Sequence, residues 1–389
     1  MKYRKLVHLN KKVVKKQNYI LTNVALRRTI WATRNSMCQK GLLKMTFYDE
    51  ILQQPEALRN FSSEVVFSEE ASKIKGLNIE NRRLIFTGMG SSLYAGYIAS
   101  DALFKKNILS QSSNVEVLME SPEVVKSKDS LFVIVSQSGS SPEVIELVNA
   151  IPDKKRIIAV TNYPKSPLFC SGGYTLSLSA GVEYCTSSKS FTNTIAAMRL
   201  LVELLSKSDD SVLERLKCRF EDAAEVIESI ISDDKRIDAI VNFFSNLAGI
   251  ACVGSGSSYT SASHLELVME EACKVYATRY SVKQFIHGPI ELINPFMGTI
   301  LLDFDPHYHT ACERVAMSME AYGGKTLWIT NRADAHSSSN TVVYRIPFED
   351  YELSPLVEII PLELAVYRYI KAQGGEAGQI HRVVKRMSL

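Results

Sequence analysis

The sequence predicts an α/β protein in which one parallel-sheet unit occurs twice, each sheet being covered by helices on both faces. Short apolar runs alternate with longer segments of helical periodicity, as in parallel sheets buried between helices. An apolar run, a Gly-x-Gly-Ser-Ser turn and a helical segment occur at Gly88 and again at Gly254, an offset of 166 residues. The segment Ile157–Asn162 matches Thr326–Asn331 at an offset of 169 residues. Two matches at nearly one period indicate a duplicated domain.

Composition agrees with two domains and a sizeable core. The 389 residues are 46% apolar and 22% charged, which excludes global disorder. The seven cysteines are scattered and form no C-x-x-C pair, so we expect a reducing, cytoplasmic environment and no zinc ribbon. No apolar run approaches the roughly 18 residues that a bilayer crossing needs, and no membrane association is expected.

The basic residues are concentrated at the N-terminus. Residues 1–44 contain twelve Lys or Arg and no acidic residue, which leaves 3 − 12 = −9 for the remainder. The main body is therefore not expected to bind nucleic acid. The extension is a nucleic-acid or membrane-surface arm, a transit peptide, or a mis-assigned start; we favour the last, because Met45 precedes a capped amphipathic helix. The predicted domains are 45–215 and 216–373, followed by a tail at 374–389.

A candidate phosphate site follows the buried strand Leu131–Val135. The chain breaks into Ser-Gln-Ser-Gly-Ser-Ser at 136–141, with Ser141 at an N-cap position and Pro142 opening a helix. Hydroxyls and backbone N–H groups would converge there on the positive end of the helix, and Gly139 would allow close approach. Hydrogen bonds to a charged partner contribute about 1.5–3 kcal/mol each, so three or four would hold a phosphate without a lysine. A serine-rich surface turn is the plainer alternative.

The second copy differs at this place. Leu302 lies 48 residues after Gly254, as Ser136 lies 48 after Gly88, and it is followed by Asp303 and Asp305. Because these carboxylates would repel a phosphate, we expect one phosphate site per chain, in the first copy.

Two residues of the second copy are candidates for acid–base chemistry. Residues 261–278 are expected to be helical, and Glu271 falls in a row with Leu267 and Val275, so we expect it to be largely buried with a raised pKa. That suits a general acid or base, although a structural glutamate is equally consistent. His287 is expected in an exposed Gly-Pro turn that opens a helix, where it could reach a ligand or be merely structural.

Two further segments could contact a sugar. The polar stretch 181–190 carries hydroxyls and Lys189 ahead of a helix, and the glycine-hinged basic tail could act as a lid. The glycine turns lack the third glycine of a dinucleotide fingerprint and the lysine of a P-loop, so no cofactor is expected. His307-Tyr308-His309 lacks an evident third ligand, so no metal is expected.

Taken together, these motifs resemble the sugar isomerase (SIS) domain family. GMGSS, SQSGSSPE, EYCTSSKSF, the helix bearing Glu271 and FIHGPIELI occur in this order. From Met45 onwards the chain is similar to the isomerase half of glutamine–fructose-6-phosphate aminotransferase. It is also similar to stand-alone hexosamine-phosphate isomerases and deaminases and to fructosamine-6-phosphate deglycases. The resemblance implies two tandem SIS domains, each a flavodoxin-like parallel sheet in an α/β/α sandwich.

The resemblance also implies a role for each site residue. Glu271 would transfer the proton between C1 and C2, His287 would open the ring in the site of a neighbouring subunit, and Lys385 would approach the sugar carbonyl. The homo-oligomer would be a dimer or larger. The phosphate would be bound by Ser136, Gln137, Ser138 and Ser141, and the sugar by Gly90, Ser91 and Ser187.

Two departures from the aminotransferase bear on the activity. The chain contains no glutaminase domain, so we expect no glutamine-dependent amination by this chain alone. The aminotransferase type has a lysine where this chain has Val268, which suits the deglycase branch better. The sequence therefore predicts an enzyme for a nitrogen-bearing hexose 6-phosphate, acting as isomerase, deaminase or deglycase, with the amine and the reaction direction left open. The alternative is a non-catalytic sugar-phosphate sensor.

Overall fold

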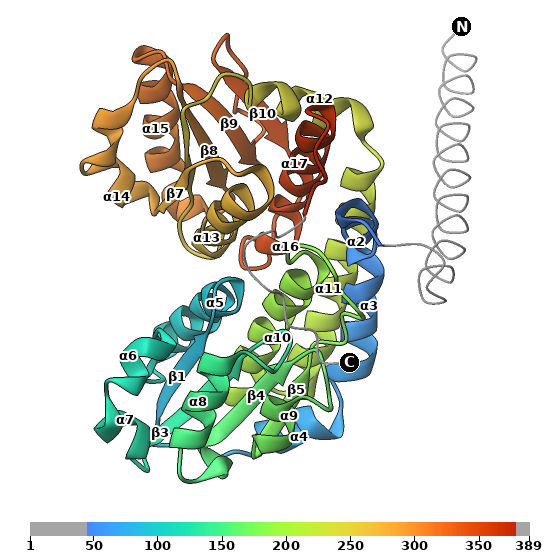
Figure 1. The fold of residues 1–389 in the computed structure, drawn as a ribbon, viewed down its shortest axis with the longest axis vertical. Coiled ribbons are helices and arrows are strands. Elements are labelled where there is room, and N and C mark those ends of the chain that lie inside the picture. Colours follow the sequence, from blue (N-terminus) through green and yellow to red (C-terminus); the bar gives the residue numbers. More distant parts are fainter. Residues whose placement is uncertain (1–44, 379–389) are drawn as a thin grey trace, which may run out of the picture.

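The computed structural model describes residues 45–378, which form two halves, each built on a five-stranded parallel sheet (Figure 1). The N-terminal extension 1–44 and the tail residue Lys385 lie outside the described residues. None of the helices within 45–378 combines the length and apolar character that a bilayer crossing requires.

The first half contains a sheet in the order β2-β1-β3-β4-β5. Its strands are β1 (Arg83–Gly88), β2 (Ser110–Ser112), β3 (Ser130–Val135), β4 (Ile157–Thr161) and β5 (Tyr174–Ser177). The helices are α2 (Phe47–Leu52), α3 (Gln54–Val65), α4 (Glu69–Lys75), α5 (Ser91–Lys105), α6 (Val115–Met119), α7 (Pro122–Lys126), α8 (Pro142–Ala150), α9 (Pro167–Ser171) and α10 (Lys189–Leu205), with the 3₁₀ turn η1 (Lys154–Arg156).

The second half repeats this arrangement in the order β7-β6-β8-β9-β10. Its strands are β6 (Gly249–Val253), β7 (Ala277–Tyr280), β8 (Met297–Asp303), β9 (Lys325–Thr330) and β10 (Thr341–Arg345). Its helices are α11 (Asp210–Ile231), α12 (Asp234–Phe243), α13 (Ser258–Val268), α14 (Val282–Ile286), α15 (His309–Ala321), α16 (Pro355–Glu358) and α17 (Ile360–Ala372). Three short turns complete it: η2 (Met269–Cys273), η3 (Pro289–Leu292) and η4 (Pro306–Tyr308). The predicted α/β class with a duplicated parallel sheet is confirmed.

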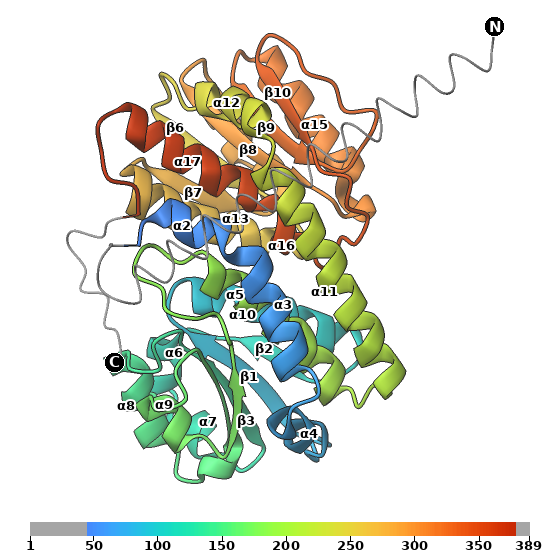
Figure 2. The ribbon, with the colours of Figure 1, turned by 90° about the vertical axis from the view of Figure 1, so that its right-hand side faces the viewer.

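Long helices join the two halves. Helix α11 packs against α3 and reaches α16 and α17 of the second half, as both views show (Figures 1 and 2). The predicted limit between residues 215 and 216 falls inside α11 rather than in a loop. The predicted helix start after Met45 is confirmed, since Thr46 and Asp49 form a reciprocal capping box at α2.

A single hydrophobic core runs through the junction. In β3 the side chains alternate: Val133 and Val135 face the core shared by both halves, while Phe132 and Ile134 pack against α6, α8 and α9. The second sheet contributes Ile300 and its neighbours to the same shared core. The relative placement of the two sheets is therefore set by close packing rather than by a linker.

The expected helix 261–278 is wrong in its second half. Helix α13 ends at Val268, a π-helical turn follows at Met269–Cys273, and Lys274 adopts a left-handed φ of 58°. Residues Ala277–Tyr280 then form strand β7, which pairs with β6. Apolar spacing alone did not show this break, because the apolar residues continue at helical intervals into the strand.

The junction also buries carboxyl groups. Glu358, the last residue of α16, is fully buried and accepts a hydrogen bond of 2.9 Å from the Ser258 hydroxyl, while its Oε1 has no partner among the described residues. Desolvation raises the pKa of Glu358 to about 7, although hydrogen bonds from nearby serines oppose that shift. This carboxyl therefore prefers its neutral form in the folded protein.

This preference gives a pH-dependent prediction. Because the folded-state pKa is raised, the stabilisation from neutral Glu358 is present below its unfolded pKa and is lost as pH rises through about 7. A Glu358→Gln variant, which cannot ionise, should gain Tm relative to wild type between pH 5 and pH 8. The corresponding gain in the free energy of unfolding is up to about 3 kcal/mol. Thermal denaturation of both proteins across this range tests it. The exposed Glu349→Gln is the matched control, and a Tm difference for Glu358→Gln that stays constant with pH would contradict the prediction.

Candidate functional site

The candidate site lies where the strand order of the first sheet reverses. Strands β1 and β3 are neighbours with Gly88 paired to Val135, so the loops that follow them emerge side by side at the carboxyl edge of the sheet. Ligands in open α/β sheets bind at this switch point. It brings the Gly90–Ser91 loop next to the Ser136–Ser141 loop, as the sequence predicted.

The Ser136–Ser141 loop has the form of an anion cradle. Ser136 accepts the Gly139 N–H at 3.1 Å, and its hydroxyl lies 3.4 Å from that of Ser141. Ser141 is the N-cap of α8 and Pro142 its first residue, as predicted. The Ser141 side chain makes no capping hydrogen bond, so its hydroxyl is not committed to the helix end. Hydroxyls and the positive end of α8 are thus directed at one place.

Gln137 supplies an independent indication of a ligand. Its side-chain Nε2 is buried and has no hydrogen-bond partner among residues 45–378. A buried amide donor without an acceptor is costly unless a ligand or water satisfies it. The backbone carbonyl of Gln137 accepts the Asn162 N–H at 3.1 Å and the Thr161 hydroxyl at 3.2 Å, which fixes the loop on β4.

Gly139 is required for a reason that the sequence did not show. Its φ is +62°, and an added Cβ would lie 2.1 Å from the Ser166 Oγ and 2.8 Å from the Thr161 Oγ1. Packing of the cradle against Ser166 therefore leaves no room for a side chain at position 139, and the positive φ also favours glycine there.

A third loop, residues 181–190, is held in place by two buried glutamates that the sequence reasoning missed. Glu183 accepts the backbone N–H groups of Ser188 and Ser190 at 3.0 and 3.1 Å, and Glu50 accepts the Tyr184 N–H at 2.5 Å. Ser187 is half-buried beside Ser190, with hydroxyls 2.9 Å apart.

Lys189 is turned inward rather than towards a ligand. It is buried as the first residue of α10, and its ammonium donates to Gln53 at 2.5 Å. Of the two groups that the sequence suggested as sugar contacts in this loop, the structure therefore favours the hydroxyls over Lys189.

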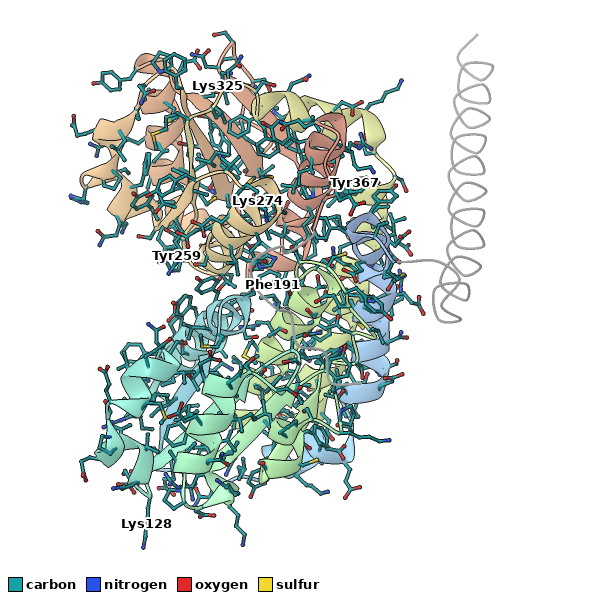
Figure 3. All side chains as sticks on the ribbon, viewed as in Figure 1. Lys128, Phe191, Tyr259, Lys274, Lys325 and Tyr367 are labelled. Atoms are coloured by element: carbon teal, nitrogen blue, oxygen red, sulfur yellow. The ribbon has the colours of Figure 1, made fainter. Side chains whose placement is uncertain are left out.

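His264 crosses from the second half into the site and was also missed. Its Nδ1 lies 2.8 Å from the Ser91 hydroxyl, and its ring stacks on Phe191 at 3.7 Å, at the junction seen in Figure 3. In the sequence, His264 is followed at intervals of four by the apolar residues Val268 and Ala272. A histidine that begins such an apolar helical row is expected to be buried, and this signal could have identified it.

The imidazole and its neighbour Glu363 are both neutral. Complete burial lowers the pKa of His264 to about 3, against the opposing effects of Glu183 and the Ser187 backbone. Desolvation raises the pKa of Glu363 well above its usual range, although Gln54 donates to it at 2.5 Å. The Nε2 of His264 lies 3.9 Å from the Glu363 carboxyl, so this contact is not a charged pair.

Glu271 lies further along the same face of α13. His264 contacts Ser91, and the Leu267 side chain lies 3.3 Å from the Cβ position of Gly90. Glu271 follows His264 by seven residues and Leu267 by four, and it lies within the π-helical turn η2. It is half-buried rather than largely buried, because the helix has widened there. Such π turns recur at functional sites.

His287 and the start of the C-terminal tail differ in their relation to the candidate site. His287 is the exposed C-cap of α14 in the second half, and Gly288-Pro289 opens the 3₁₀ turn η3, so the predicted exposed turn is present. The structure does not bring His287 to the cradle of its own chain. Gly378, the last described residue, accepts the Thr186 N–H at 3.1 Å and thus enters beside Ser187.

The second copy carries carboxylates where the first has its cradle. Asp303 is buried, accepts the Trp328 N–H at 3.1 Å and lies 2.7 Å from the His309 Nδ1. Asp305 accepts the His307 backbone N–H at 3.0 Å, and its Oδ2 lies 2.9 Å from the Cβ position of Gly256. Carboxylates beside this glycine loop make an anion site there unfavourable.

Comparison with known proteins finds chains that are similar to this one in sequence and in fold. No family model matches the chain. It is 24% identical to the glutamine–fructose-6-phosphate aminotransferase (isomerizing) of Escherichia coli K12 over 90% of this chain and 60% of the relative. The chain thus spans about 60% of the length of the curated relatives it matches.

Solved structures agree in fold. The C-terminal domain of the aminotransferase from Francisella tularensis has a TM-score of 0.75 at 22% identity, covering 87% of this chain and 98% of that one. The glucosamine-6-phosphate deaminase of Thermotoga maritima has a TM-score of 0.66 at 16% identity, covering 88% and 99%. The resemblance to SIS-domain proteins is confirmed.

The state of His264 can be tested directly. Because burial lowers its pKa to about 3, His264 should stay neutral between pH 5 and pH 8, with its proton on Nε2 and Nδ1 accepting from Ser91. Imidazole nitrogen NMR should show one histidine that does not titrate and that disappears in His264→Gln. The exposed His336→Gln is the matched control and should leave the His264 resonance in place. A midpoint near pH 6.5 for the His264 resonance would contradict this assignment.

Proposed function

We propose that this chain is a phosphosugar enzyme that acts on a nitrogen-bearing hexose 6-phosphate by proton transfer between C1 and C2. The observation that carries the proposal is that the serine loop and the Gly90–Ser91 loop meet at the β1–β3 switch point. The serine loop also contains the buried Gln137 amide, which has no hydrogen-bond partner within residues 45–378. An anion of phosphate size matches the first loop, and the ring of a sugar matches the second.

The phosphate would be bound by the cradle residues in two ways. The hydroxyls of Ser136, Ser138 and Ser141 and the amide of Gln137 donate to phosphate oxygens, and the N-terminus of α8 adds favourable electrostatics. Gly90, Ser91 and Ser187 would line the sugar. The His264 Nδ1 lies 2.8 Å from the Ser91 hydroxyl, and this contact would hold the hydroxyl in place beside the sugar.

The chemistry would be divided among three residues. His287 of a neighbouring subunit opens the ring, Glu271 carries the proton between C1 and C2, and Lys385 approaches the carbonyl carbon. Water then releases the amine, or the isomerised sugar leaves. Gly378 lies at the Ser187 loop, and seven further residues can span about 23 Å, enough to bring Lys385 to the sugar. Proton transfer by positioned groups contributes about 10²–10⁴-fold, and no cofactor or metal is required by this scheme.

The names of similar proteins support a substrate that contains nitrogen. One is an aminotransferase of fructose 6-phosphate, and another is a deaminase of glucosamine 6-phosphate. Val268 stands three residues before Glu271, where the aminotransferase type has a lysine, and this departure suits the deglycase branch better.

A turnover screen identifies the reaction. The purified chain is incubated with glucosamine 6-phosphate, galactosamine 6-phosphate and several fructosamine 6-phosphates, without cofactor, and products are followed by mass spectrometry. Release of an amine with a hexose phosphate supports a deaminase or deglycase. Binding of sugar phosphate without turnover of any substrate would overturn the enzyme and favour a sensor.

Glu271→Gln tests the base. Loss of the proton acceptor should reduce kcat about 10²–10⁴-fold with little change in the Kd of the sugar phosphate, since Glu271 contacts neither the cradle nor the phosphate in this scheme. Steady-state kinetics and calorimetry on the best substrate measure both quantities. The exposed neighbour Glu270→Gln is the matched control and should retain near wild-type kcat. Equal turnover by both variants would exclude Glu271 as the base.

Complementation tests whether His287 acts in a partner subunit. His287→Ala and Glu271→Gln should each be nearly inactive alone. After subunit exchange, the mixture should recover about a quarter of wild-type activity if the two residues meet across subunits. About half of the dimers are then mixed, and one of the two sites in each mixed dimer is intact. No recovery after subunit exchange, verified by mass spectrometry of the mixed dimer, would place His287 in its own chain's site or outside the mechanism.

A further inference from the structure

Glu183 is fully buried in the third loop of the site and accepts hydrogen bonds on both of its oxygens. Its Oε1 accepts the backbone N–H groups of Ser188 and Ser190 at 3.0 and 3.1 Å, and its Oε2 accepts the Ser190 hydroxyl at 2.5 Å. The Ser188 hydroxyl also approaches Oε1, at 3.4 Å. A carboxyl group that receives backbone and hydroxyl donors on both oxygens is stabilised as the anion, which only accepts hydrogen bonds.

The Ser190 hydroxyl fixes the direction of the next hydrogen bond. A hydroxyl has one hydrogen to donate, and that of Ser190 is used at Glu183. The Ser187 and Ser190 hydroxyls lie 2.9 Å apart, so the hydrogen between them comes from Ser187. Because its hydrogen points inward, the Ser187 oxygen offers only lone pairs to a group on its outer side.

Ser187 lies close to the other loop that is expected to contact the sugar. It is partly exposed, whereas the residues on both sides of it are buried. Phe191, labelled in Figure 3, follows four residues later and stacks on the His264 ring at 3.7 Å. The Nδ1 of the same His264 lies 2.8 Å from the Ser91 hydroxyl. The loop that carries Ser187 and the Gly90–Ser91 loop therefore meet at one histidine.

From this relay of Glu183, Ser190 and Ser187 we infer that Glu183 is a positioning residue, which holds the Ser187 oxygen as a hydrogen-bond acceptor facing the ligand. The ligand group at Ser187 must then donate a hydrogen bond, as a hydroxyl or an ammonium group does. A group without a donor faces lone pairs there and is disfavoured. The inference rests on the proposed function, in which Ser187 lines the sugar.

A purely structural role for Glu183 makes a different prediction. A glutamate that only capped the start of α10 would need the backbone N–H groups of Ser188 and Ser190, but no particular direction for the hydroxyls. The preference of the site for a donor separates the two roles.

Deoxyfluoro sugars test the direction of the hydrogen bond at Ser187. Calorimetry on the purified chain compares glucose 6-phosphate with its 2-, 3- and 4-deoxyfluoro analogues, in which fluorine replaces one hydroxyl and cannot donate. Wild type should bind at least one analogue about tenfold more weakly than glucose 6-phosphate, because the Ser187 acceptor then faces fluorine. Binding of all four compounds with equal affinity would overturn the inference.

The Glu183→Gln variant should reverse the relay. The two backbone N–H groups require an oxygen, so the amide oxygen takes the Oε1 position and the amide NH₂ faces Ser190. Ser190 then donates to Ser187, and Ser187 donates outward. The preference should fall to about threefold or less, while glucose 6-phosphate, whose hydroxyls also accept, remains bound. Ser190→Ala, which interrupts the relay and keeps the backbone N–H, should lower the preference as well.

Ser188→Ala is the matched control, because it removes a hydroxyl from the same carboxylate and leaves the contact between Ser187 and Ser190 in place. It should keep the wild-type preference, and loss of the preference in this variant would overturn the role of the relay. An unchanged preference in both Glu183→Gln and Ser190→Ala, with folding confirmed by circular dichroism, would also overturn it. Failure of wild type to bind any of the four sugar phosphates would instead overturn the proposed function, and this inference with it.

Discussion

The packing of α5 against α13 across the junction is the contact on which the other features depend. It continues the single hydrophobic core that both sheets share, so the crossing of these helices is fixed by close packing. The crossing places His264 beside Ser91, and Ile98 of α5 lines a cavity together with Ser257. The helix pair therefore borders both the candidate site and this cavity, and a shift of either helix would alter the surroundings of both.

Burial at this crossing also explains the unusual protonation states. His264, Glu358 and Glu363 are enclosed, and solvation is the main stabiliser of a charged side chain, so each prefers its neutral form. A neutral imidazole has one donor and one acceptor nitrogen, and its Nδ1 lies within hydrogen-bond distance of the Ser91 hydroxyl. Desolvation, rather than ion pairing, thus sets the polarity of the groups that pack beside Ser91.

Local patterns predicted most of the fold and the position of the serine loop before α8. The repeat at Gly88 and Gly254 predicted two similar sheets, and the Ser141-Pro142 cap predicted the start of α8. The end of α13 was missed because apolar spacing continues through residue 276. The repeat itself contained the correction, since β2 begins at Ser110 and β7 at Ala277, nearly one period apart.

The long-range partners could not be derived from local spacing. Glu50 holds a loop that lies 134 residues later in the sequence, and Ser91 meets His264 at a separation of 173 residues. Such pairs depend on how the two sheets pack, which periodicity does not encode.

Duplication explains why the second copy could diverge while the fold was kept. A parallel sheet covered on both faces requires apolar strands and close glycine turns, and both copies retain them. The copies nevertheless differ in charge where β3 and β8 end, with Ser136–Ser141 in the first and Asp303–Asp305 in the second, while the pairing of β1 with β3 and of β6 with β8 is the same. Helix α13 contributes His264 to the candidate site, and α5 contributes Ile98 to the cavity beside the Gly256–Ser257 loop, so the packed pair α5–α13 borders both places. A ligand that displaced either helix would change the surroundings of both, and such a coupling would be reciprocal in binding free energy.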